Sequence, residues 1–215
     1  MNKVILPASP IGTFKMAFLD RPSPKYDTFS ANLVIKPGAL ARDGRSIEQV
    51  KTWLEGILAD YRAEVIKADP KKKNYGSRLP IEMDVDELGD ETGDYVLKAK
   101  QGATITRKDG TVINVKVDLF DPRGKRLEGV PVGRGSTGRI GGKVFGYVAE
   151  SNKQIGLSIY LEAAVILTLT SPGQRDASTY GFGEEDGYEG LGGDDSSSNI
   201  SAPEESDAGG GDSNF

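Results

Sequence analysis

The chain opens with two segments in which apolar and polar side chains alternate, which is the period of a β-strand with one buried face. They are Gly12–Asp20 and Tyr26–Ile35. Between them, Arg21–Pro24 contains two prolines, which interrupt strands. The pattern therefore predicts two strands joined by a turn. One face of the second strand carries Phe29, Ala31, Leu33 and Ile35.

One helix is predicted, from Ser46 to Lys67. Ser46 is a favourable N-cap, and Gln49 follows three residues later in the capping-box pattern. Apolar side chains then recur every three or four residues, which indicates a helix with one buried face. This stripe consists of Ile47, Val50, Leu54, Ile57, Leu58, Tyr61 and Val65. We expect the helix to pack on a sheet.

Four more strands are predicted further along, at Tyr95–Lys100, Thr111–Phe120, Gly138–Glu150 and Ile155–Thr170. The acidic segment Asp84–Asp94 is predicted to be a loop. On the last strand the odd positions predict the buried face, so Ile166 falls on the polar side, where the helix or a second subunit would cover it. Five or more strands with one interposed helix predict a mainly β protein with an OB-like five-stranded barrel. A β-sandwich is the second choice.

Beyond Thr170 the composition changes to Ser, Gly, Asp and Glu. Residues 171–215 hold one Arg and 11 acidic residues, a net charge of −10, whereas residues 1–170 hold 26 Lys and Arg against 21 acids, a net charge of +5. We therefore divide the chain into a body, residues 1–170, and a tail, residues 171–215. The tail is expected to be disordered, because it can bury little apolar surface. A basic body is expected to meet a polyanion.

The tail ends on an aromatic residue, Phe215, with Asp212 three residues before it. An isolated aromatic at the end of a disordered segment has no packing role. We interpret Phe215 and Asp212 as a handle that a partner protein captures.

Composition also restricts the chemistry. The chain has no cysteine and no histidine, which removes thiol chemistry and the commonest general base and metal ligand. We therefore expect no enzymatic activity and no cofactor. A nuclease using carboxylate-bound magnesium is the enzymatic alternative, with Asp84, Asp86 and Glu87 as its nearest acidic cluster. Met1–Pro10 lacks the pattern of a signal peptide and no apolar run could span a membrane, so a cytoplasmic protein is expected.

The predicted strand Gly138–Glu150 interleaves cations and rings on one face. Cations neutralise phosphates and rings stack on unpaired bases, so this pattern favours single-stranded nucleic acid. Neighbouring strands and turns add residues of the same kinds. Arg134 lies in a Gly-rich segment without the Gly-Lys-Ser/Thr ending of a Walker loop, where it could touch a nucleic-acid backbone. The candidate contacts are Arg139, Lys143, Phe145, Tyr147, Tyr160, Lys116, Lys98, Lys100, Arg107 and Arg134.

The segment from Phe120 to Ser136 reads Phe-Asp-Pro-Arg-Gly-Lys-Arg-Leu-Glu-Gly-Val-Pro-Val-Gly-Arg-Gly-Ser. It resembles the single-stranded DNA-binding proteins of T-odd bacteriophages, in which an Asp-x-x-Gly-Lys turn precedes a Val-Pro stretch and a Gly-x-Gly-Ser loop. The final strand, from Gly156 to Leu167, and the acidic tail closing on Phe are similar to the same family.

This resemblance implies an OB-fold that coats single-stranded DNA without sequence preference during phage replication, recombination and repair, in the host cell cytoplasm. It also implies a homodimer, and a tail that docks on the replicative DNA polymerase and the helicase-primase and competes with DNA for the basic groove. An alternative from another class is a β-rich virion or assembly protein with a flexible acidic tail, which would form large particles and ignore oligonucleotides.

Overall fold

The computed structural model describes residues 4–107 and 109–170. The tail, with Asp212 and Phe215, lies outside the described residues, so the predicted boundary at Thr170 and the predicted disorder stay predictions. In the part of the chain that is described, no helix is long and apolar enough to cross a membrane. The elements are Val4–Leu6 (β1), Gly12–Ser23 (β2), Thr28–Ile35 (β3), Ile47–Ala68 (α1), the 3-10 helix Pro70–Asn74 (η1), Gly76–Arg78 (β4), Ile81–Val85 (β5), Glu91–Gly102 (β6), Thr104–Thr106 (β7), Val112–Asn114 (β8), Asp118–Phe120 (β9), Arg126–Leu127 (β10), Thr137–Ala149 (β11) and Gln154–Thr168 (β12).

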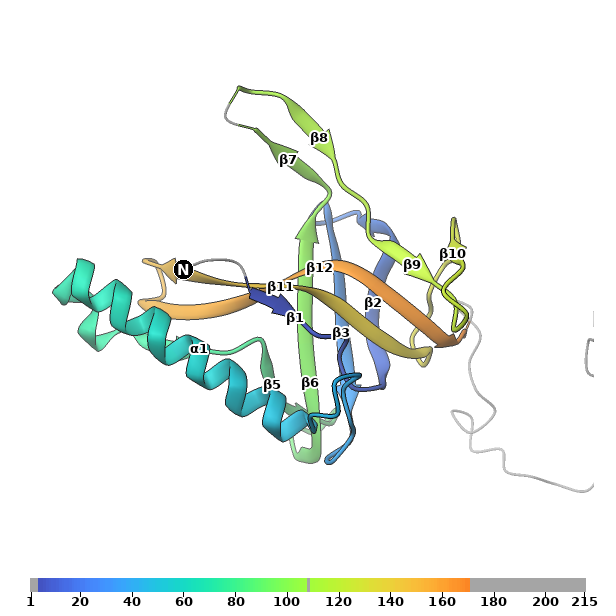
Figure 1. Ribbon diagram of the computed structural model, residues 1–215, viewed down its shortest axis with the longest axis horizontal. Coiled ribbons are helices and arrows are strands. Elements are labelled where there is room, and N and C mark those ends of the chain that lie inside the picture. The colour runs from blue at the N-terminus through green and yellow to red at the C-terminus, as the bar shows by residue number, and fades with distance from the viewer. Residues whose placement is uncertain (1–3, 108, 171–215) are drawn as a thin grey trace, which may run out of the picture. The chain divides into compact units, whose positions relative to one another are not determined.

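Five strands form a ring in the order β2–β3–β6–β12–β11 and back to β2 (Figure 1). Neighbours are antiparallel except β6 and β12, which are parallel. Two of the joints are short: β2 meets β11 through two residue pairs, and β6 meets β12 at Lys100 and Tyr160. A small, partly open five-stranded barrel of this kind is an OB-fold. The prediction of a mainly β, OB-like barrel with one interposed helix is confirmed.

The barrel is filled by the apolar side chains that alternate along its strands. At least one side chain from each ring strand is almost completely inaccessible to water, and together they form one continuous core with the buried face of α1. Examples, one from each strand of the ring, are Phe14, Leu33, Leu97, Val144 and Ile159. Burying a large apolar side chain contributes about 1.5–3 kcal/mol, so this core is what holds the ring closed across its two short joints.

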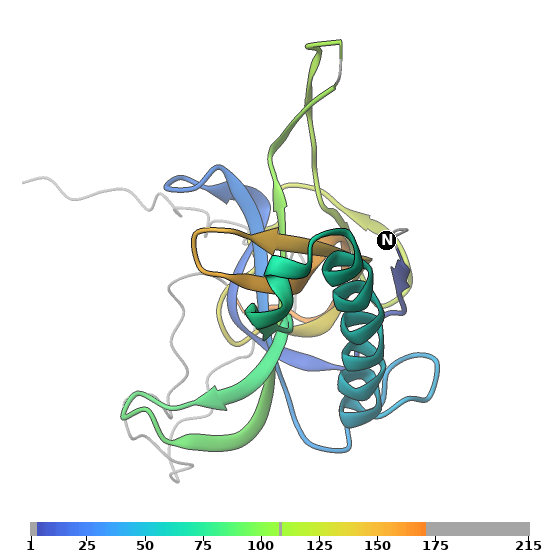
Figure 2. The ribbon, with the colours of Figure 1, turned by 90° about the vertical axis from the view of Figure 1, so that its left-hand side faces the viewer.

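Helix α1 begins as the sequence predicts. The Ser46 hydroxyl oxygen accepts a hydrogen bond from the Gln49 backbone N–H (3.3 Å), and the Gln49 side-chain oxygen accepts one from the Ser46 N–H (2.9 Å). The helix lies beside the outer end of the long hairpin made by β11 and β12 (Figures 1 and 2). There the Tyr61 ring packs on Gly146, where an added Cβ would come within 2.3 Å of the ring.

The hairpin β11–β12 contains a β-bulge that the sequence pattern does not reveal. Gly141 pairs with Ala163 and Gly142 pairs with Leu161, so Glu162 has no partner in the ladder. The strands approach so closely here that a Cβ on Gly142 would lie 1.8 Å from the Tyr160 carbonyl oxygen. The bulge reverses the buried face of β12. Beyond it Ile166 is 4% exposed and part of the core, so the prediction that it lies on the polar side is wrong.

Two other sequence predictions differ from the structure. The single strand expected from Thr111 to Phe120 is two short strands, β8 and β9, in different sheets. The acidic loop expected from Asp84 to Asp94 is shorter than predicted, because β5 ends at Val85 and β6 begins at Glu91, which leaves a turn at residues 86–90. Strands β7 and β8 pair with each other in a separate two-stranded sheet. They form an arm, of which residues 104–107 and 109–114 are described, that projects from the barrel in both ribbon views (Figures 1 and 2).

Candidate nucleic-acid interface

An open groove of about 800 Å³ lies across β3 and β6, the second and third strands of the ring in chain order. This is the face on which OB-folds bind oligonucleotides. Four candidate contacts from the sequence line it together: Lys98 and Lys100 from β6, and Phe145 and Tyr147 from β11. The rest of the wall is Met16, Tyr26, Thr28, Ser30, Asn32, Arg78, Leu79, Pro80, Glu82, Ala99, Leu157 and Ser158.

A second hollow, of about 450 Å³, lies where the arm joins the barrel. Three more candidate contacts line it: Lys116, Lys143 and Tyr160. The groove and this second hollow meet at two rings, because Phe145 lines the first and Tyr160 lines the second, and their centroids are 5.0 Å apart at an interplanar angle of 56°. Seven of the ten candidate contacts thus belong to two adjoining hollows on the barrel.

The Tyr147 ring is held in place by a glycine on the neighbouring strand. Tyr147 of β11 pairs directly with Gly156 of β12. A Cβ added to Gly156 would lie 2.6 Å from the Tyr147 ring. The ring therefore covers the backbone of Gly156, and the absence of a side chain there lets it lie flat against the sheet.

The lysines of this face differ in their partners. Lys98 forms an ion pair with Glu82, and Lys143 forms one with Glu162 at 2.5 Å. Within residues 4–107 and 109–170, no ion pair holds Lys100, Lys116 or Arg78. These three cations are exposed. The face therefore presents both lysines with an internal partner and cations with none.

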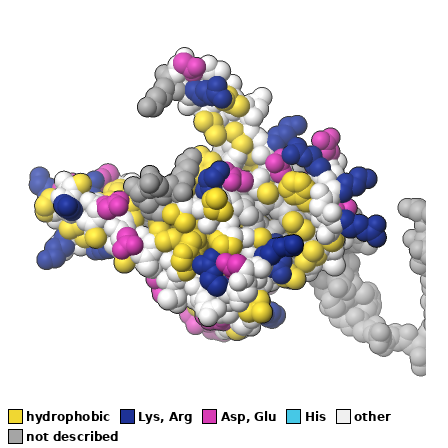
Figure 3. Space-filling view, in the orientation of Figure 1, with side chains coloured by type: hydrophobic (Ala, Val, Ile, Leu, Met, Phe, Trp, Pro, Cys, Tyr) yellow, Lys and Arg dark blue, Asp and Glu magenta, His cyan; other side chains and the backbone are white. Residues whose placement is uncertain are grey.

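Charge alone does not single out the groove. In the space-filling view, Lys and Arg side chains lie on the arm, over the end with β9 and β10, and near the C-terminal end of α1, with acidic side chains among them (Figure 3). The combination of a hollow, outward-facing rings and cations distinguishes the interface from these other basic surfaces.

Arg139 is placed apart from the two hollows. Its guanidinium donates hydrogen bonds to the carbonyl oxygens of Ser9 (2.6 Å) and Leu40 (3.1 Å). Burial and, second, the positive charge of Arg42 lower the pKa of Arg139 from its ordinary value. In the structure Arg139 ties the N-terminal segment and the loop before α1 to β11.

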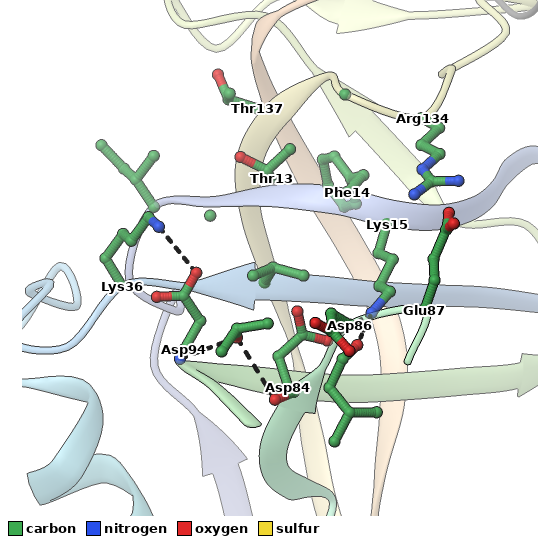
Figure 4. Close-up of a pocket in the computed structure, with 16 residues that line it drawn as sticks. Thr13, Phe14, Lys15, Lys36, Asp84, Asp86, Glu87, Asp94, Arg134 and Thr137 are labelled. Carbon is green, nitrogen blue, oxygen red and sulfur yellow. Dashed lines mark hydrogen bonds and ion pairs between the residues drawn. The ribbon is translucent and has the colours of Figure 1, made fainter. Parts of the chain in front are cut away.

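Arg134 and Arg107 also lie away from the groove. Arg134 lines a separate hollow of about 800 Å³, on the same side as Glu87 (Figure 4). Most charges in that hollow are paired with one another, for example Lys15 with Asp84 at 2.6 Å. Arg107 lies in the arm, next to its turn, where its backbone N–H donates to the Thr111 carbonyl (2.8 Å).

The acidic cluster of the magnesium alternative is occupied by protein contacts. Asp84 accepts from the Lys15 ammonium (2.6 Å), and one carboxylate oxygen of Asp86 accepts from the backbone N–H groups of Leu88 (2.8 Å) and Asp90 (2.9 Å). In the described part of the chain, no group of three or more acidic side chains is arranged to hold a metal ion.

The 3-10 helix η1, which contains three consecutive lysines, and Tyr75 after it contact the tip of the β11–β12 hairpin. Lys72 pairs with Glu150 at 2.6 Å, and the Tyr75 hydroxyl donates to the same carboxylate at 2.5 Å. These two hydrogen bonds, that of Lys72 first, lower the pKa of Glu150 from its ordinary value. Glu150 follows the last residue of β11, so this contact fixes the hairpin end that lies next to the groove.

Sequence reasoning missed several groove residues. Tyr26, which is 66% exposed, belongs to the turn between the first two ring strands. Arg78 belongs to β4, a three-residue strand that the sequence pattern does not indicate. The available signal was topological: once the first two strands were assigned to an OB barrel, their connecting turn could have been expected to border the ligand face.

The fold and these hollows define a class: an OB-barrel protein whose ligand face combines cations with aromatic rings. No family model matches the sequence, and no curated protein matches it. Among solved structures, the crystal structure of gp2.5, a single-stranded DNA-binding protein encoded by bacteriophage T7, aligns with a TM-score of 0.66 and 22% identity over 87% of this chain and 98% of that chain. The chain therefore has the fold of the T7 protein.

The single-stranded DNA-binding protein of bacteriophage Enc34 also matches. Its complex with single-stranded DNA aligns with a TM-score of 0.40 and 14% identity, over 78% of this chain and 88% of that chain. Its C-terminally truncated form aligns with a TM-score of 0.43 and 15% identity, over 77% of this chain and 87% of that chain.

Proposed function

We propose that this protein binds single-stranded DNA without sequence preference, through the groove across β3 and β6 and the adjoining second hollow. The observation that carries the proposal is the gathering of Lys98, Lys100, Phe145 and Tyr147 in one groove on the ligand face of an OB barrel. Stacking on such rings contributes about 1–3 kcal/mol per base and tolerates any sequence. The likeness to the T7 protein supports the same function.

The proposal includes a biological setting. The protein acts in the replication, recombination and repair of phage DNA, as a homodimer in the cytoplasm of the host cell. Its tail recruits the replicative DNA polymerase and the helicase-primase through Phe215 and Asp212, and its negative charge competes with DNA for the basic face. The charge difference between body and tail supports this division of roles. No catalytic step is involved.

Salt titration of oligonucleotide binding tests the proposal. For single strands, log K falls with log[salt] by about 0.7 for each phosphate that a cation neutralises. We expect tighter binding to single-stranded than to double-stranded oligonucleotides. We expect Lys100→Gln to reduce the slope by about 0.7, and Tyr147→Ala or Tyr26→Ala to weaken binding by about 5- to 150-fold.

Lys67→Gln is the matched control, because Lys67 is exposed on the last turn of α1 and lines neither hollow. Its effect on the slope should be small. The proposal fails if the wild-type protein ignores single strands at low salt. Assembly into large particles without DNA would instead favour the virion or assembly protein.

A further inference from the structure

Each hollow of the interface contains one lysine that already binds a carboxylate. Glu82 of β5 pairs with Lys98 in the groove, and Glu162 of β12 pairs with Lys143 in the second hollow. The side chains in these two pairs are 39–47% exposed. Pairs this exposed contribute about 0–1 kcal/mol each, so another anion can replace the carboxylate at small cost.

The position of Glu162 follows from the pairing of the hairpin. Lys143 pairs directly with Tyr160, and Glu162 lies two residues beyond Tyr160, so alternation along β12 places it on the same outer face as Lys143. Diagonal neighbours across two strands are close enough for long side chains to meet. The bulge begins at this point, because Glu162 has no partner in the ladder between Leu161 and Ala163.

A DNA phosphate that approaches either lysine competes with the glutamate carboxylate for the ammonium group. Two unit charges of the same sign about 4 Å apart repel by about 1 kcal/mol in water and about 4 kcal/mol near a protein surface. A Lys–Glu pair also has no net charge, so its contact with DNA releases no counterion overall. Both effects weaken binding and flatten its dependence on salt.

We infer that Glu82 and Glu162 act as internal competitors of the DNA backbone, holding Lys98 and Lys143 until a phosphate displaces them. The inference rests on the proposed function and adds a control of affinity within the binding site itself. It assigns these two carboxylates the role of limiting how tightly the body holds DNA, so that a bound strand can leave.

Glutamine substitution tests the inference, because Glu→Gln keeps the shape of the side chain and removes the charge. We expect Glu82→Gln and Glu162→Gln in the full chain each to tighten binding to a single-stranded oligonucleotide at low salt, by up to about fivefold. Each should also steepen the slope of log K against log[salt] by about 0.7. The gain from Glu82→Gln should disappear when Lys98→Gln is added.

Glu55→Gln is the matched control. Glu55 pairs with Lys51 on α1 at 3.5 Å and lines neither hollow, so it undergoes the same change of charge away from the site. The inference is overturned if Glu82→Gln and Glu162→Gln shift affinity and slope no more than Glu55→Gln does. Weaker binding would overturn it as well, since the carboxylates would then only support their lysines. Failure of the wild-type protein to bind single strands would be a different result, one that removes the proposed function itself.

Discussion

Tyr147 lies in the groove because the residue opposite it has no side chain. The ring covers Gly156, its direct partner across the hairpin. Cross-strand contacts between an aromatic ring and a glycine hold the ring against the sheet. At the residue scale, Gly156 is therefore a positioning residue for the Tyr147 ring, which we propose stacks on bases.

Gly156→Ala should displace the Tyr147 ring, because the added Cβ would lie 2.6 Å from it, while the Tyr147 side chain itself stays unchanged. We expect weaker binding to single-stranded oligonucleotides, by no more than the loss caused by Tyr147→Ala, which is about 5- to 150-fold. The double variant Gly156→Ala/Tyr147→Ala should bind no more weakly than Tyr147→Ala alone, because neighbours that act through one contact are not additive. Affinity and thermal unfolding are the measurements.

Gly141→Ala is the control for that experiment. Gly141 lies in the same hairpin, and an added Cβ there would meet nothing within 4 Å. Its affinity should match that of the wild-type protein. Additive losses in the double variant would show that Gly156 acts in some way other than through Tyr147.

Residue patterns predicted rings and lysines that the structure places in the two hollows, but they did not predict where every candidate side chain lies. Alternation along one strand placed Arg139 with Lys143 and Phe145, yet Arg139 binds the carbonyls of Ser9 and Leu40. These partners are 130 and 99 residues away in sequence, and local periodicity contains no information about them. The residues that line the groove from β4 and from the β2–β3 turn were missed for the same reason.

At the element scale, strands with strict alternation and the capped helix were predictable, because their signals are local. The bulge was not, since it depends on how closely β11 and β12 approach at Gly142. The division of Thr111–Phe120 was not either. Val115 leaves the arm to bond with Ala103, its N–H donating to that carbonyl at 2.7 Å, and such a contact across the chain has no sequence signature.

The arm offers a test at this scale. Ile105 lines the second hollow at the base of the arm, and Val112, further along the arm, is 61% exposed. We expect a variant in which Asn-Gly joins Ile105 to Ile113 to fold normally, since these two residues face each other across the arm and a two-residue turn suits such a pair. It should bind long single strands more weakly, while short oligonucleotides that fill only the groove bind nearly as before. Fluorescence anisotropy with oligonucleotides of graded length measures this.

The shortened arm also loses net positive charge, so its control is Arg107→Gln with the arm intact. If Arg107→Gln reproduces the whole loss of affinity, the arm contributes to DNA binding through its charge and not through its contact surface. An equal loss for short and long oligonucleotides would mean that the arm does not extend the path of DNA beyond the groove.

At the scale of the whole molecule, the chain combines two opposite charges: a net +5 in residues 1–170 and −10 in residues 171–215. The role inferred for Glu82 and Glu162 is competition with DNA at single lysines. A tail of this charge would compete over the whole face. The two kinds of competition should differ in their dependence on salt. A direct ion pair resists salt better than attraction between distant charges, which is screened within about 10 Å at 0.1 M salt.

Removal of residues 171–215 should therefore tighten binding to single-stranded DNA, by roughly tenfold or more at low ionic strength. The gain should shrink as salt rises and the screening length falls toward about 3 Å at 1 M.

A variant that lacks only Phe215 keeps all 11 acidic side chains of the tail and should bind DNA as the full chain does, while losing its protein partners. Anisotropy titrations of the three proteins across a salt series separate the effects. Unchanged or weaker binding after removal of residues 171–215 would mean that the tail does not compete with DNA. An altered DNA affinity in the variant without Phe215 would mean that the aromatic ring, rather than the negative charge, is the competitor.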